Sequence, residues 1–103
     1  MNTKTRKLVE KARQGNKPAM KALIEGTRAR LHEYVNRLTL DMDLTDEIVQ
    51  DSLITMMEQL HTLRQDDQFW PWLSKIALNR MRRVYRDRGK RNGKSLEHHQ
   101  LQQ

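Results

Sequence analysis

Apolar residues recur at three- and four-residue steps along most of the chain, which is the spacing of an α-helix. The clearest case lies between residues 68 and 91. The apolar positions there fall on one stripe of a helix and are Trp72, Leu73, Ile76, Ala77, Met81 and Val84. Polar positions recur at the same steps on another face and are Lys75, Asn79, Arg82 and Arg86. The pattern predicts a helix that packs inward on one side and presents an amide and three cations on the other.

Three more helices are predicted before this one. Residues 3–14 form a short helix with Leu8, Val9 and Ala12 inward, which Gly15 ends in a left-handed conformation. Asn16 caps the second helix, which runs to about residue 39 with a proline in its first turn. The apolar face of this second helix consists of Met20, Leu23, Ile24, Leu31, Tyr34, Val35 and Leu38.

An aspartate-rich turn leads into the third helix, which either Asp43 or Thr45 can cap and which ends near Leu60. Its core-facing residues are Val49, Leu53, Met56 and Leu60. A second, mostly acidic stripe on this helix consists of Glu47, Asp51, Ile54 and Glu58, with Gln50 beside it. Acidic residues early in a helix also favour its dipole, which explains Asp46 and Glu47 without any partner.

A polar loop over residues 61–67 joins the third and fourth helices, and Asp66 or Asp67 can cap the fourth. That helix is expected to end at about Arg88. The residues after Gly89 are polar and without periodicity, which predicts a flexible tail or linker. We therefore predict an all-α protein: a compact four-helix domain over residues 1–91, followed by a polar linker or tail over residues 92–103.

Composition excludes several classes of protein. The chain has 103 residues, of which 36% are hydrophobic and 32% charged, so one domain with a small helical core is expected. It has no cysteine, which fits a reducing cytoplasm and rules out disulfides and thiolate metal sites. No membrane span or signal peptide is apparent. No acid–base pair, phosphate loop or metal-ligand spacing is apparent either, so we expect no enzyme, cofactor or metal.

Charge is distributed in blocks. Residues 1–40 contain ten basic and three acidic residues, residues 41–67 one basic and eight acidic, and residues 79–94 eight basic and one acidic. The formal net charge is +7. These blocks predict two unlike surfaces, a basic one for a polyanion and an acidic one for a basic partner.

The aromatic and basic fourth helix has two interpretations. Single-stranded nucleic acid binds where bases stack on rings and the backbone follows positive charge. The simpler interpretation is a core helix with a solvated face, because a run of charged residues usually does no more than keep one face of a helix in water. Phe69 and Trp72 are more often core residues than stacking platforms, so Trp70 is the better candidate for exposure.

The ordered set of these features resembles a family. DEIVQDSLITMMEQL followed by FWPWLSKIALNRMRR is similar to region 2 of the sigma-70 family of bacterial RNA polymerase sigma factors, above all to the extracytoplasmic-function subgroup. The matching elements are the acidic pair Asp46–Glu47, the run Ile48–Val49–Gln50–Asp51, then Phe69, Trp72–Leu73 and Ile76–Ala77–Leu78–Asn79.

This resemblance implies a monomeric transcription initiation factor domain that works without a cofactor. Its third helix would dock on the basic coiled coil of the largest subunit of core RNA polymerase, through Asp46, Glu47, Gln50, Asp51, Ile54 and Glu58. Its loop and fourth helix would bind and help to melt the promoter −10 element on the non-template strand. The implied DNA-binding residues are His61, Leu63, Arg64, Gln65, Trp70, Lys75, Asn79, Arg80, Arg82, Arg83 and Arg86. An anti-sigma factor is a further implied partner.

Departures from the family pattern affect the promoter sequence more than the fold. Leu63 stands where many relatives carry an aromatic residue in the loop that captures a base. The chain also stops in what would be the linker to region 4, so it is either one domain of a longer protein or a one-domain relative. Two alternatives stay open: a sigma-like module that binds an anti-sigma factor and never touches DNA, and a small catalytic helical domain.

Overall fold

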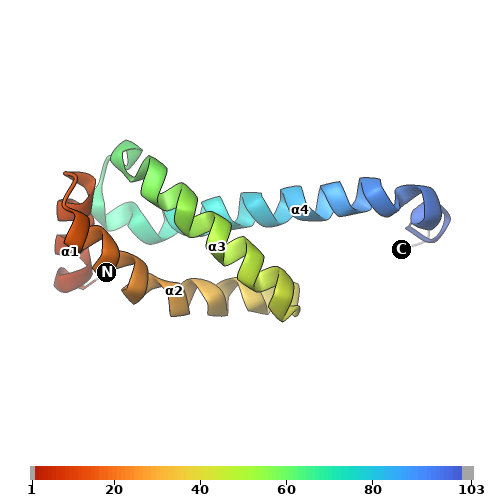
Figure 1. Ribbon diagram of the computed structural model, residues 1–103, viewed down its shortest axis with the longest axis horizontal. Helices are drawn as coiled ribbons and strands as arrows, with labels where there is room; N and C mark the ends of the chain where they lie inside the picture. Colours follow the sequence, from red (N-terminus) through yellow and green to blue (C-terminus); the bar gives the residue numbers. More distant parts are fainter. Residues whose placement is uncertain (1, 101–103) are drawn as a thin grey trace.

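The computed structural model describes the backbone of residues 2–100 and the side chains of residues 2–89. Its elements are α1 (Thr3–Arg13), α2 (Lys17–Thr39), α3 (Met42–Gln59), the 3₁₀ turns η1 (Leu60–Thr62) and η2 (Asp66–Gln68), and α4 (Phe69–Gln100). In space, α2 packs against α1 and α3, and α3 packs against α4 (Figure 1). The described residues contain no strand, so the predicted all-α, four-helix fold is confirmed.

The start and end of α1 and the start of α2 lie where capping chemistry predicts. The side-chain oxygens of Asn2 and Asn16 each accept a backbone N–H from the first turn of the following helix at 2.8 Å. Gly15 stands at the corner between α1 and α2 with φ 94°, in the left-handed region that glycine tolerates best. The predicted cap and the predicted helix stop are both confirmed.

The start of α3 differs from the prediction. Asp41, rather than Asp43 or Thr45, caps the helix by accepting a backbone N–H of the first turn at 3.0 Å. The side chain of Thr45 is buried instead, with its hydroxyl 2.7 Å from that of Thr39 at the end of α2. Leu40 takes a left-handed conformation with φ 54°, so the chain reverses direction early and α3 begins sooner than expected.

One apolar core joins the four helices. Val9 of α1, Leu31 of α2, Ile48 of α3 and Leu73 of α4 are all fully buried. The predicted stripe of α4 faces this core, because Ala77, Met81 and Val84 are buried as well. The core positions are spaced by polar residues, and no described helix has an apolar stretch long enough to cross a membrane.

Two expectations about helix ends are corrected. Leu38, predicted to face inward, is 48% exposed in the last turn of α2. The fourth helix does not end near Arg88, since its backbone continues to Gln100 and projects beyond α2 and α3 (Figure 1). The added segment is polar and contains two glycines, so neither its polarity nor its helix propensity accounts for the continued helical backbone. The predicted linker over residues 92–103 has side chains outside the described residues.

Candidate functional site

The acidic stripe of α3 has an apolar centre. Glu47, Gln50 and Glu58 are exposed side chains of α3, and Ile54 between them in sequence is nearly half exposed. Met57, one turn beyond Ile54, is half exposed too. Sequence reasoning missed Met57, because methionine at helical spacing usually fills a core. An apolar centre with a charged rim is the usual anatomy of a protein-binding surface.

Two of the predicted acidic residues are already paired within the domain. Asp51 Oδ2 accepts a hydrogen bond from Nε of Arg80 on α4 at 2.9 Å, and Nη2 of Arg80 forms an ion pair with the same oxygen at 2.8 Å. Asp46 Oδ1 lies 2.9 Å from Nε2 of His32 on α2. The first pair links the two predicted surfaces and removes one charge from each, since Asp51 was assigned to the acidic surface and Arg80 to the basic one.

We expect the Asp51–Arg80 pair to contribute about 0.5–1 kcal/mol to the free energy of unfolding. The estimate is low because water screens the pair: the two side chains are 33% and 35% exposed. A double-mutant cycle of Asp51→Asn and Arg80→Gln, followed by urea unfolding, measures this coupling. Strictly additive losses would show that the two charges do not interact in solution.

The basic face of α4 lies where the pattern predicts it. Lys75, Asn79, Arg82 and Arg86 are all exposed on one side of the helix, and Arg83 is exposed beside them. Among these, Arg86 has an ion contact, 4.0 Å from Nε to the carboxylate of Asp87, but both side chains are about two-thirds exposed. So loose a contact contributes little, and Arg86 can turn to another anion.

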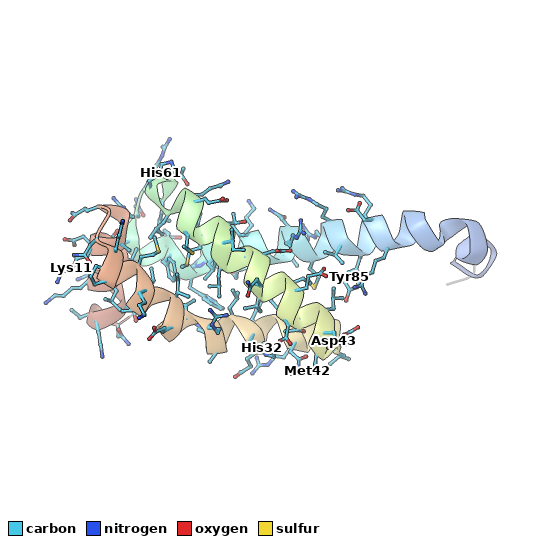
Figure 2. The ribbon with its side chains drawn as sticks, in the orientation of Figure 1. Lys11, His32, Met42, Asp43, His61 and Tyr85 are labelled. Carbon is cyan, nitrogen blue, oxygen red and sulfur yellow. The ribbon has the colours of Figure 1, made fainter. Side chains whose placement is uncertain are left out.

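Trp70 is not the open ring that was expected. The guanidinium of Arg30 lies 3.9 Å from the centre of its ring, and Tyr34 packs edge-on against it with ring centroids 6.0 Å apart. The exposed aromatic residue of α4 is Tyr85, 45% exposed (Figure 2). The run RRVYRDR carried the signal for it, because Tyr85 is an aromatic residue off the apolar stripe and among arginines.

The α3–α4 loop, residues 61–67, has a buried side and a polar side. Leu63 is only 5% exposed and packs into the core, so its side chain faces away from any ligand above the loop. His61, Arg64 and Gln65 are exposed, and His61 projects outward at the end of α3 (Figure 2). Asp66 caps no helix through its side chain, which binds Arg13 of α1 instead.

These surfaces offer charge and hydrogen-bonding groups on rigid helices. Among the residues with described side chains, no three His, Cys, Asp or Glu side chains are placed to hold a metal ion. A notch of about 320 Å³ between α3 and α4 separates the two faces and is lined by Glu47, Arg80, Val84, Asp87 and Arg88. Acidic and basic side chains both line this notch, so it lies at the boundary between the acidic face of α3 and the basic face of α4.

Comparison with known proteins indicates one family. The model of sigma-70 region 2 matches residues 23–91, which is more than half of the chain. The ECF RNA polymerase sigma-E factors of Haemophilus influenzae and Salmonella typhimurium are 29% and 30% identical over 84 residues, covering 82% of this chain and 44% of each relative. RNA polymerase sigma factor NccH of Alcaligenes xylosoxydans xylosoxydans is 32% identical over 81 residues, covering 79% of this chain and 44% of that protein. The chain thus spans less than half the length of these relatives, and no solved structure matches it significantly.

The family match covers both candidate surfaces. It includes most of α2, all of α3, the loop, and α4 as far as Arg91. The acidic pair and the Val–Gln–acidic run lie on α3, and the Ile–Ala–x–Asn run lies on α4. The motifs that resemble the family are therefore on the two helices that carry the acidic and the basic face. The chain therefore belongs to the sigma-70 family, as a region 2 domain of the extracytoplasmic-function type.

Proposed function

We propose that this domain acts in bacterial transcription initiation by holding core RNA polymerase and a promoter strand at the same time. The observation that carries the proposal is the placement of two faces of opposite charge on adjacent helices, α3 and α4. The sigma factor names of its relatives support the same role. It is a binding role and requires no catalysis.

The polymerase would bind the α3 face. Its basic coiled coil, on the largest subunit, would meet Glu47 and Glu58 at the rim and Ile54 and Met57 at the centre, with Gln50 beside them. Apolar contact would supply most of the affinity there, while the charges would speed association and fix orientation. Asp46 and Asp51 lie at the margin of this face and are already paired within the domain.

The non-template strand of the −10 element would bind α4 and the α3–α4 loop. Lys75, Arg82, Arg83 and Arg86 would contact phosphates, which position the strand without reading it. Asn79 would read a base edge, because an amide both donates and accepts. Tyr85 is the exposed ring on which a base could stack.

The loop would receive a base drawn out of the stack, which helps the promoter to melt. Extrusion costs a few kcal/mol, and the pocket must recover that cost. Its exposed polar residues His61, Arg64 and Gln65 would supply the hydrogen bonds. Leu63 would not touch the base, because it is buried, and it would instead hold the loop against the core.

Replacing Asn79 tests the reading function. We expect Asn79→Ala to lower discrimination among −10 sequences by about fivefold or more, with a smaller effect on mean affinity. Arg82→Ala on the same face is the matched variant, and it should weaken binding to all sequences alike. Binding to a randomised −10 library measures both quantities. An unchanged sequence preference in Asn79→Ala would show that another residue reads the base.

A module that binds only proteins, such as an anti-sigma factor, is the second candidate. Its support is that Arg80 and Trp70 are engaged within the domain, by Asp51 and Arg30. Against it stands the exposed face with Asn79 and its cations, which such a module would not need. Failure of the whole library to bind, with polymerase binding intact, would favour this second candidate. We propose an anti-sigma factor as a partner in either case.

A further inference from the structure

We propose that Arg13 of α1 is a positioning residue for base recognition by the α3–α4 loop, through its ion pair with Asp66. Arg13 Nη1 lies 2.5 Å from Asp66 Oδ1, a contact between residues 53 positions apart. The two side chains are 30% and 21% exposed, which makes this the least exposed ion pair among the described residues. The inference rests on the proposed function of the loop.

The pair holds one end of a short exposed segment. At the near end, Leu63 is buried, and its N–H donates to the carbonyl at the start of η1 at 3.0 Å. At the far end, Asp66 opens η2 and is held by Arg13. Only Arg64 and Gln65 lie between these two anchors, and both are exposed. The residues best placed to contact a base are therefore fixed on each side by a different kind of contact.

Arg13 is a firm anchor because of its position on α1. It is the last residue of the helix, directly after Ala12, which is buried in the core, and just before the tight corner at Gly15. A guanidinium is planar and always charged, so its hydrogen bonds to a carboxylate fix direction as well as distance. The core thereby sets the place of Asp66 in the loop. Because Asp66 neutralises it, Arg13 is poorly suited to hold a phosphate itself.

Loss of the anchor should affect specificity more than affinity. A base is read through hydrogen bonds with narrow limits of distance and angle, so the side chains that make them must be held within about 0.5 Å. Without the pair, Arg64 and Gln65 would sample more positions, and the preferred and the wrong base would be bound more equally. Phosphate contacts on α4 belong to another element and would persist. A purely structural role of Arg13 would instead weaken binding to every sequence alike.

The test compares Arg13→Gln, Asp66→Asn and the exchanged pair Arg13→Asp with Asp66→Arg in the whole chain. Lys11→Gln is the matched control, because Lys11 is an exposed cation of the same helix. The readouts are the ratio of preferred to disfavoured sequences in a single-stranded −10 library, and hydrogen exchange of the loop amides. We expect each single variant to lower that ratio about fivefold and to speed exchange in the loop. The exchanged pair should recover most of the ratio, and Lys11→Gln should change neither.

Three results would overturn the inference, and they differ from one another. A wild-type ratio in both single variants would show that the pair does not position the loop. An equal fall in binding to all sequences, not recovered by the exchange, would leave Arg13 with a role in folding alone. If the wild-type chain shows no preference at all, the proposed function fails and this inference fails with it. Should Arg13→Gln not fold, Asp66→Asn gives the same readout with a smaller change.

Discussion

Replacing Lys75, Arg82 and Arg86 together by glutamine should lower the affinity for single-stranded DNA on the order of a hundredfold at about 0.05 M salt. Each phosphate neutralised on a single strand contributes about 0.7 to the slope of log affinity against log salt. With Arg83 as a fourth contact, the wild-type slope should be about −3, and that of the triple variant should be shallower than about −1. Arg80 is left out of this estimate because Asp51 already neutralises it.

A matched triple variant separates local contacts from overall charge. Lys4, Lys7 and Lys11 are exposed lysines on α1, so changing them to glutamine removes the same charge from another helix. Fluorescence titrations of an oligonucleotide at several salt concentrations give the affinity and slope of each protein. Equal losses in the two variants would mean that net charge, and not the face of α4, attracts the strand.

The helices could be predicted from the sequence because the residues that one face of a helix buries must recur at three- and four-residue steps. Leu73, Ala77 and Met81 recur at the required step and do face the core. The α2–α3 turn could not be resolved in this way, since several of its residues are able to cap a helix. The left-handed conformation of Leu40 decides between them, and nothing in its side chain signals that conformation.

The candidate site could be predicted only where one helix carries it. The exposed face of α4 follows from periodicity, as Asn79 and Arg82 illustrate. Contacts between elements do not follow from it, because they depend on how the helices pack. The Asp51–Arg80 pair, the cover of Arg30 over Trp70 and the burial of Leu63 under the loop are all of that kind. In each case a residue that was predicted to bind DNA or polymerase is instead paired, covered or buried within the domain.

Glu47→Lys combined with Glu58→Lys should weaken binding of this chain to core RNA polymerase on the order of a hundredfold. Both glutamates are exposed side chains of α3, and neither belongs to an ion pair of the described residues. Reversing them replaces attraction to a basic coiled coil by repulsion, and unfavourable charge contacts across an interface cost several kcal/mol. A loss of about 3 kcal/mol corresponds to slightly more than a hundredfold in the dissociation constant.

This pair of sites disturbs the packing of α3 on α4 less than Asp51 does, because Asp51 is bonded to Arg80, whereas Glu47 only lines the same notch and makes no ion pair among the described residues. A cation at position 51 would stand beside Arg80, so a loss of binding could reflect altered packing of α3 on α4. Glu10→Lys with Glu25→Lys is the matched control, because it changes the net charge equally at exposed sites of α1 and α2 that belong to no ion pair of the described residues. Pull-down of core polymerase, with circular dichroism to verify folding, compares the two variants. If both bind as well as the wild type while remaining helical, α3 is not the polymerase-binding surface, and the apolar centre at Ile54 and Met57 must serve another partner.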